Sequence, residues 1–484
     1  MIEEAAADLI AELTGARLVG STLVSESGST VMLLRPGGVR LCRLLAEGAS
    51  GPFTMAESRL MARLARRGML RLAAPSGARA PSVSAVVPAL DASGVAECLA
   101  SLVRIPEVSE IVLTSDGSHE AGRLAELAAA HGARFLALER NRGPGAARNA
   151  GAALAGGEVL LFLDSDATAL PGLAELLRLF VSAKLSVAAP RVVSRSQDGG
   201  SLLAGVIAGY ETLRSPLDMG PSPGEAGDLP RYLPAACLAV RAADFREVGG
   251  FDESLRYGED VDLLWRLRNR GAIAYYSGDE GAAHMARPTL SAFLGQRFSY
   301  GTSAAPLVRR HPGVLTHLSM DEVTPALAIL PWAGVGLRLA SLAEARLRLR
   351  SSARRVGLGS RDHHGASKAV VAELAGELSM LTRTLGLPAL GLAVVSTRLR
   401  RKVVTLLGLL AALRALQAAQ QGAAAPLSLA SGALSVADDL AYSAGLARGC
   451  LAERSLAAYS PQLRKGPLLS RMTRPASKAS ARRV

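Results

Sequence analysis

Short apolar runs alternate with segments of helical spacing from residue 82 onward, and this pattern predicts an α/β fold. Apolar runs typical of buried strands cover residues 83–87, 111–114, 135–138 and 159–163. Segments with helical periodicity separate them, over residues 92–102, 120–131 and 146–154. Strands and helices that alternate in this way form a doubly wound, mainly parallel sheet, and Pro88 is expected to end the first strand.

The strand predicted over 159–163 is followed at once by Asp164 and Asp166. In open α/β sheets the ligand crevice lies at the carboxyl ends of the strands. An Asp-x-Asp pair at that place can bind a hard divalent cation, with phosphate oxygens completing the shell. The alternative is an Asp-rich turn that caps the helix predicted over 171–181.

Polar residues also follow the neighbouring strands. Asp116 ends the strand at 111–114, where its carboxylate could accept hydrogen bonds from a ribose or base, although Asp before Gly is also common in plain turns. Gly143 and Gly145 let the backbone approach a phosphate, and Arg148 could meet a diphosphate or be an ordinary helix-surface arginine. The loop matches neither the Walker pattern nor the dinucleotide pattern.

A further amphipathic helix is predicted after Gly258, ending at Gly271. Its first two residues, Glu259 and Asp260, are adjacent and cannot face the same way. One could cap the helix while the other points into the cleft as a general base. Acids in the first turn also suit the helix dipole, so a structural role is the alternative.

Between these parts, strands are predicted over 187–189 and 234–241, and a helix and turn over 245–250. The segment 197–229 is rich in Gly, Ser and Pro and is predicted to be a mobile loop over the site.

The first 74 residues predict a small winged-helix-like unit. A strand at 29–34, helices at 39–46 and 54–66 and a closing strand at 68–72 make up the pattern, with Thr54 and Glu57 as a capping box. Arginines on the second helix leave DNA binding open, with a solvated basic face as the alternative. Residues 75–81 form a linker.

The C-terminal third predicts helices with uncharged runs at 323–337, 384–397, 403–413 and 415–437. The first three are shorter than the roughly 20 residues needed to span a bilayer, and the fourth is diluted by polar residues. Short apolar helices beside Arg398, Arg400, Arg401 and Lys402 could lie in a membrane interface or pack as a helical subdomain. The basic end, 464–484, is expected to be disordered.

Charge and cysteine usage narrow the choice of partners and compartment. A net charge of +13 fits nucleic acid, anionic nucleotide substrates or an anionic membrane. The four cysteines are far apart in sequence, which argues against zinc and disulfides and fits a reducing cytosol. The acidic start, residues 1–4, does not look like a signal peptide, so a cytoplasmic location is expected.

Taken together, the motifs between residues 81 and 290 resemble glycosyltransferase family 2, inverting enzymes of the GT-A fold. The matching segments are Val86–Pro88, Ser115–Ser118, Asn141–Gly151, Asp164–Asp166, Gly249–Asp252 and Glu259–Asp260. Ser115 stands where the family usually has the first acid of an Asp-Asp-Gly-Ser motif.

This resemblance implies roles for particular residues. Mg²⁺ or Mn²⁺ would be bound by Asp166 and Asp164, with His284 as a third ligand. Asp260 would be the catalytic base, with Glu259 as the runner-up. The nucleotide sugar would be bound by Pro88, Asp116, Arg148, Asp164, Gln296 and Arg297.

A narrower resemblance, to the glycosyltransferases of mycofactocin gene clusters, covers nearly the whole chain. It rests on Tyr300–Leu307, Arg310–Pro312 and Asp438–Tyr442, and on the N-terminal unit, which looks like peptide-recognition domains. It implies transfer of glucose from a UDP- or GDP-hexose to a peptide-derived redox cofactor. The expected domains are 1–76, winged-helix-like; 77–318, GT-A; and 319–484, helical with a basic tail.

Three other functions compete with this one. A family 2 enzyme could act on a polysaccharide or lipid-linked acceptor at a membrane. A nucleotidyltransferase would need a Gly-rich loop with a cation after the first strand, and residues 88–91 offer neither. A non-catalytic winged-helix nucleic-acid binder would not need the acidic residues, so no nucleic-acid partner is expected.

Overall fold

The computed structural model describes residues 8–25, 31–65, 69–196, 201–221, 232–312, 318–320 and 361–463. The chain forms two compact units, Met1–Phe293 and Leu294–Val484, and each is described by itself. The predicted helix at 323–337 and the basic tail at 464–484 lie outside the described residues.

The first unit is built around an eight-stranded sheet with the strand order β10-β13-β11-β12-β9-β6-β7-β8. Its parallel half consists of β6 (Val83–Ala89), β7 (Val108–Asp116), β8 (Arg134–Leu138) and β9 (Val159–Leu163). The other half consists of β10 (Ala167–Ala169), β11 (Leu185–Arg195), β12 (Cys237–Arg241) and β13 (Ile273–Met285). Here β12 runs antiparallel to both of its neighbours, β11 and β13 are parallel, and β10 pairs antiparallel with β13.

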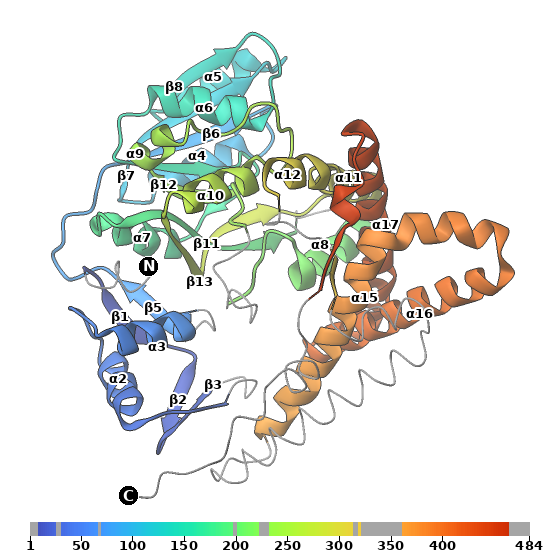
Figure 1. Ribbon diagram of the computed structural model, residues 1–484. Coiled ribbons are helices and arrows are strands. Elements are labelled where there is room, and N and C mark those ends of the chain that lie inside the picture. Colours follow the sequence, from blue (N-terminus) through green and yellow to red (C-terminus); the bar gives the residue numbers. More distant parts are fainter. Residues whose placement is uncertain are drawn as a thin grey trace, which may run out of the picture. The chain divides into compact units, whose positions relative to one another are not determined.

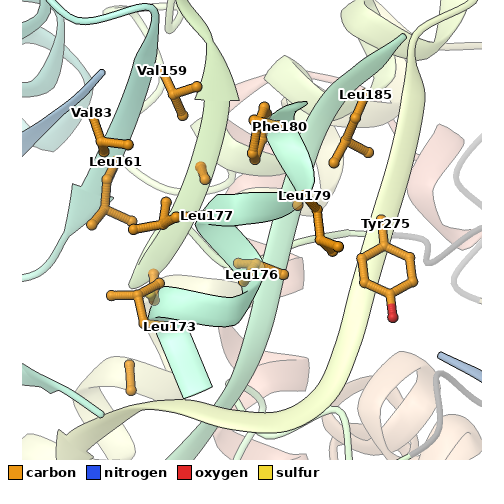
Figure 2. Packing of buried hydrophobic residues seen from close by; sticks show 14 of the residues in the cluster. Val83, Val159, Leu161, Leu173, Leu176, Leu177, Leu179, Phe180, Leu185 and Tyr275 are labelled. Carbon is orange, nitrogen blue, oxygen red and sulfur yellow. The ribbon is translucent and has the colours of Figure 1, made fainter. Parts of the chain in front are cut away.

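Helices join and cover these strands, as the alternating pattern predicts (Figure 1). They are α4 (Val95–Val103), α5 (Ala121–Ala130), α6 (Pro144–Leu154), α7 (Gly172–Arg178), α9 (Ala242–Glu247) and α10 (Glu259–Asn269). Figure 2 shows how α7 turns Leu173 and Leu177 toward the strands, close to Leu161, and all three side chains are fully buried. Every residue of β9 is buried, which agrees with the prediction of a central strand at this place.

The N-terminal part of this unit has more strands than the sequence predicted. A three-stranded sheet is formed by β2 (Ala16–Val19), β3 (Thr22–Ser25) and β4 (Val31–Leu33), and β1 (Ile10–Leu13) pairs with β5 (Leu70–Ala73). Two helices, α2 (Pro36–Ala46) and α3 (Met55–Ala65), fall where they were predicted. The capping box is confirmed, because the Thr54 N–H donates to Glu57 Oε2 at 3.0 Å and the Glu57 N–H donates to Thr54 Oγ1 at 3.3 Å.

Two predictions in the first unit were wrong in part, and one strand was not predicted. The segment predicted as a mobile loop contains α8 (Leu202–Arg214), which Ser201 caps by accepting from the Ala204 N–H at 3.2 Å. This helix is held in place by Tyr210, which packs edge-on against Phe293 at 5.5 Å between ring centroids. The strand β13 was not predicted, and β6 continues through Pro88 to Ala89.

The described residues of the second unit are mainly helical. They form the end of α11 (Leu290–Thr302), α12 (Ala304–Arg310), α15 (Arg361–Val395), α16 (Thr397–Gln420) and α17 (Ala425–Ala452), and the short strands β14 (Leu318–Met320) and β15 (Pro461–Leu463) pair in parallel. Two stretches, Leu374–Val395 and Thr397–Gln420, are long and apolar enough to cross a membrane by length and composition. The uncharged run at 403–413 lies inside α16, whereas the run at 384–397 crosses the end of α15 at Val395 and the run at 415–437 crosses the turn between α16 and α17.

The predicted fold class is confirmed: a mainly parallel α/β sheet is combined with a small N-terminal α+β part and a helical C-terminal region. This arrangement matters for function because it brings the carboxyl ends of β7 and β9, the start of α10 and the end of β13 to one part of the first unit.

Candidate active site

The turn after β9 places Asp164 and Asp166 beside β13. The Asp166 carbonyl accepts from the Met285 N–H at 3.1 Å, and Ala167 pairs directly opposite His284. As a result, one ligand atom each from Asp164, Asp166 and His284 lies within 4.8 Å of the others. The sequence predicted these three residues as metal ligands, and the structure brings them together.

Arg148 on α6 links the Asp-x-Asp turn to the start of α10. Its Nη2 donates to Asp164 Oδ1 and its Nη1 to Glu259 Oε1, both at 2.6 Å. The Arg148 side chain is 5% exposed, so the two ion pairs lie in a desolvated place. Burial works to lower the pKa of Arg148, but the charges of Asp164 and Glu259 outweigh it and raise that pKa. Arg148 is therefore a fixed cation between two carboxylates.

Glu259 and Asp260 point in different directions, as their adjacency on α10 requires. Glu259 is buried against Arg148, whereas Asp260 is partly exposed and accepts from the Ala235 N–H at 3.1 Å and the Val261 N–H at 2.8 Å. Although the residue is partly exposed, desolvation of its carboxyl group raises the pKa of Asp260, and the nearby charge of Asp164 adds to the rise while Arg148 opposes it. Asp260 thus shares an electrostatic environment with Arg148 and Asp164.

Asp116, at the end of β7, contacts the Gly-rich loop. Its Oδ1 accepts from the Arg142 N–H at 2.7 Å and its Oδ2 from the Gly143 N–H at 2.9 Å. Gly117 has a φ of +64°, and a Cβ there would overlap the backbone of the same loop. Asp116 therefore positions this loop, and its predicted contact with a nucleoside stays a prediction, as does that of Pro88, which pairs with Thr114 in the sheet.

Known proteins with similar sequences identify the family. Residues 84–225 match the family model "Glycosyl transferase family 2". The chain is also 36% identical over 328 residues to the pre-mycofactocin glycosyltransferase of Mycobacterium tuberculosis (strains CDC 1551 / Oshkosh and H37Rv), a match that covers 65% of this chain and 68% of the relative. The chain is a family 2 glycosyltransferase.

Among solved structures, this glycosyltransferase is similar to the mannosyltransferase PcManGT from Pyrobaculum calidifontis, solved in complex with GDP-Man and Mn²⁺. The TM-score is 0.38 at 15% identity, covering 71% of this chain and 89% of that one. It is also similar to TarS of S. aureus, with a TM-score of 0.33 at 18% identity, covering 46% of this chain and 39% of that one.

The donor atoms of this glycosyltransferase fit a divalent cation. Two carboxylates and an imidazole are suitable ligands for Mn²⁺, and for Mg²⁺ when oxygen atoms dominate the shell. Burial opposes ionisation of Asp166, but its hydrogen bond to His284 and the charges of His284 and Arg287 lower its pKa to about 2. Asp166 is thus ionised across the physiological pH range, as a carboxylate ligand must be, whereas His284 has to lose its proton to bind the ion.

Arg287 is a residue that the sequence reading missed. Its Nη1 lies 3.1 Å from Asp166 Oδ2, while His284 Nε2 lies 3.1 Å from Asp166 Oδ1. Its position three residues after His284 in His-Met-Ala-Arg was the available signal, but without the strand β13 there was no reason to place it beside the acids. Arg287 adds a positive charge next to the candidate metal ligands.

Gln296 and Arg297 belong to the second unit. Arg297 is 1% exposed, and its Nε donates to Asp438 Oδ2 at 3.3 Å while its Nη1 donates to Gln296 Oε1 at 3.0 Å. Asp438 and its neighbour Asp439 are themselves buried and also bind Arg383 of α15. This network stabilises the packing of α11, α15 and α17, and the predicted binding of a nucleotide sugar by Gln296 and Arg297 stays a prediction.

The raised pKa of Glu259 predicts that the stability of the folded protein depends on pH. Burial and the charge of Asp260 raise its pKa from 4.5 to about 7, although Arg148 opposes the rise. Because the folded state holds this proton more tightly than the unfolded state, its stabilising effect is complete below pH 4.5 and is lost as the pH rises through about 7. Glu259→Gln should remove this fall in the unfolding free energy, on the order of 3 kcal/mol.

Urea denaturation at a series of pH values measures this effect, with the exposed Glu126→Gln as control. If the unfolding free energy of Glu259→Gln falls between mildly acidic and mildly alkaline pH as steeply as that of the parent protein, Glu259 is not the group that binds the proton.

Proposed function

We propose that this family 2 glycosyltransferase moves a hexose, expected to be glucose, from a UDP- or GDP-hexose to an acceptor hydroxyl with inversion at the anomeric carbon. The observation that supports it best is the convergence of Asp164, Asp166 and His284 with the Arg148–Glu259 pair and Asp260. An enzyme of this family needs a place for a diphosphate and a base near it, and these residues supply candidates for both.

Each side chain has a role in the proposed reaction. Asp260 takes the proton from the acceptor hydroxyl, whose oxygen attacks the anomeric carbon on the face opposite the nucleotide. The bond between that carbon and the diphosphate oxygen breaks, and the nucleoside diphosphate leaves. A Mg²⁺ or Mn²⁺ ion held by Asp166, Asp164 and His284 would supply neutralisation of charge on the leaving diphosphate. Arg148 keeps Asp164 and Glu259 in place.

The accessibility of the two side chains favours Asp260 as the base over Glu259. A general base works best when its pKa approaches the operating pH and its oxygen can reach the substrate proton. Burial raises the pKa of Asp260, and the side chain keeps some exposure. Glu259 also has a raised pKa, but it is 9% exposed and its Oε1 is bound to Arg148. Glu259 is therefore better suited to positioning.

The acceptor is proposed from the relative that covers most of the chain. That relative is a pre-mycofactocin glycosyltransferase, so we expect a peptide-derived redox cofactor precursor as acceptor, in the cytoplasm. The second candidate is a polysaccharide or lipid-linked acceptor at a membrane, which the two apolar helices of the second unit favour.

The N-terminal part has a surface suited to a peptide. A hollow of about 390 Å³ is lined by Gly20, Ser21, Leu34, Pro36, Val39, Arg40 and Arg43. It lies beside β4, an edge strand of its sheet, to which an extended peptide could add. Arg43→Glu is expected to raise the KM for a peptide-derived acceptor about tenfold and leave the KM for the nucleotide sugar unchanged. If the variant and the parent have the same KM for the acceptor as well as for the nucleotide sugar, this hollow does not bind the peptide part of the acceptor.

The function is tested by incubating the protein with UDP-glucose, UDP-galactose, GDP-glucose and GDP-mannose, each with Mn²⁺ and each class of acceptor. We expect nucleoside diphosphate as the product, with the anomeric configuration of the new bond inverted when measured by NMR. Release of pyrophosphate, or turnover of none of these donors with any acceptor, would contradict the proposal.

A further inference from the structure

The turn between α15 and α16 carries an unusual group of exposed apolar side chains. Leu392 is 58% exposed, Val394 79%, Val395 83% and Val404 64%. The first three lie in the last turn of α15, and Val404 lies near the start of α16. Four large aliphatic side chains that face solvent within 13 residues are unfavourable in water, because burial of each would be favourable.

Positive charges occupy the same turn. Arg398, Arg400, Arg401 and Lys402 are all exposed on the first turns of α16. No acidic residue occurs in the sequence between Glu377 and Asp438. We name the group formed by Leu392, Val394, Val395, Arg398, Arg400, Arg401, Lys402 and Val404 the hairpin tip.

The backbone presents this group at the end of a hairpin. Figure 1 shows α15 and α16 as two arms that meet in a turn lying away from α17. Pro388 lies inside α15, where its ring and missing N–H favour a bend in the helix. Ser396 caps α16 by accepting from the Leu399 N–H at 3.3 Å, which fixes the turn between the apolar and the cationic side chains.

Two other occupants fit the tip less well. A pair of membrane-spanning helices would require the turn with its four cations to cross or remain in the bilayer, which is costly for each charge. A second copy of this chain would place like charges opposite one another in a symmetric contact. Apolar side chains flanked by cations fit the boundary between acyl chains and anionic headgroups, where both find partners.

We propose that the hairpin tip binds the surface of an anionic membrane. Leu392, Val394, Val395 and Val404 enter the boundary between headgroups and acyl chains, and the three arginines and Lys402 bind lipid phosphates. This binding is independent of sugar transfer, so either proposal can fail without the other.

Vesicle flotation tests the proposal on the full-length protein. Vesicles of phosphatidylcholine with about 30% phosphatidylglycerol should bind the protein, pure phosphatidylcholine vesicles should bind it much more weakly, and high salt should release it. The variant Arg398→Gln, Arg400→Gln, Arg401→Gln should bind on the order of 100-fold more weakly, since each cation near an anionic surface contributes about fivefold. The apolar variant Leu392→Ser, Val394→Ser, Val395→Ser should lose roughly tenfold or more.

Matched controls remove the same groups elsewhere. Arg59→Gln, Arg79→Gln, Arg104→Gln removes three exposed arginines, and Leu429→Ser, Leu451→Ser, Leu456→Ser removes three exposed leucines of the second unit. Both should bind like the parent, and all variants should keep nucleotide-sugar turnover in detergent-free solution.

Three outcomes would overturn the proposal. In the first, the tip variants bind vesicles as well as their controls do. In the second, the bound protein resists release by high salt and alkaline extraction, and in the third, the protein binds no vesicles and instead forms a dimer that the tip variants dissociate.

Discussion

Asp260→Asn is expected to lower kcat by about a thousandfold while the KM for the nucleotide sugar changes by less than about threefold. The amide cannot take the proton of the acceptor hydroxyl, so the loss falls on the chemical step. The change keeps the size of the side chain and one oxygen, which can accept from the Ala235 or Val261 N–H as the carboxylate does. Initial rates with varied nucleotide sugar separate the two constants.

The comparison with two other variants makes this result specific. Asp279→Asn changes an exposed carboxylate that pairs with Arg71, and it should leave both constants unchanged. Glu259→Gln should lower kcat less than Asp260→Asn, because Glu259 positions Arg148. A larger loss in Glu259→Gln would exchange the roles of the two acids, and full activity of Asp260→Asn would exclude Asp260 as the base.

Asp166→Asn is expected to give the other large effect, a loss of transfer of at least about a thousandfold together with a loss of Mn²⁺ affinity. Asp166 is the carboxylate whose low pKa and contacts with His284 and Arg287 place it at the centre of the candidate metal site. The neutral amide is a weaker ligand, and His284 and Arg287 would lose the charge that they contact.

Electron paramagnetic resonance of free Mn²⁺ measures this affinity without turnover, in the presence and absence of a nucleoside diphosphate. The parent and Asp279→Asn should bind Mn²⁺ equally, and Asp166→Asn should bind it at least about tenfold more weakly. Unchanged Mn²⁺ affinity in Asp166→Asn with lost transfer would mean that this carboxylate serves the substrate and not the metal.

Much of the sheet could be predicted from the sequence because its parallel strands are buried on both faces. The run Val159–Leu163 is apolar at every position, and the structure buries every one of them. The polar residues that follow such a run must lie at the sheet edge, which is why Asp164 and Asp166 could be predicted as site residues. Capping signals were equally informative, since Thr54, Glu57 and Gly271 all act locally.

Features that depend on distant pairing could not be predicted. The strand β13 holds His284 opposite Ala167, residues 117 positions apart, and no local pattern encodes that register. Its sequence, with Ser, Gly, Asp and Glu in the middle, lacks the apolar run of a central strand. The helix α8 was hidden by the Gly- and Ser-rich segment around it, although Tyr210 and Ile207 bury one face.

The roles of the buried charged residues also could not be predicted from the sequence. Arg148 could have been a surface residue, and only the structure shows that it joins Asp164 to Glu259. Arg297 resembled a substrate-binding arginine, but its buried partner Asp438 is 141 residues away in the chain.

The central claim is that Asp164, Asp166, Glu259 and Asp260 surround one metal ion and one nucleotide sugar. A crystal structure with Mn²⁺ and an unreactive nucleotide-sugar analogue tests it most directly, with anomalous scattering to locate the manganese. The account predicts manganese bound to Asp166 and His284 and to the diphosphate, with the Asp260 carboxylate on the face of the anomeric carbon opposite the nucleotide. Manganese away from Asp166, or a sugar bound out of reach of Asp260, would contradict it.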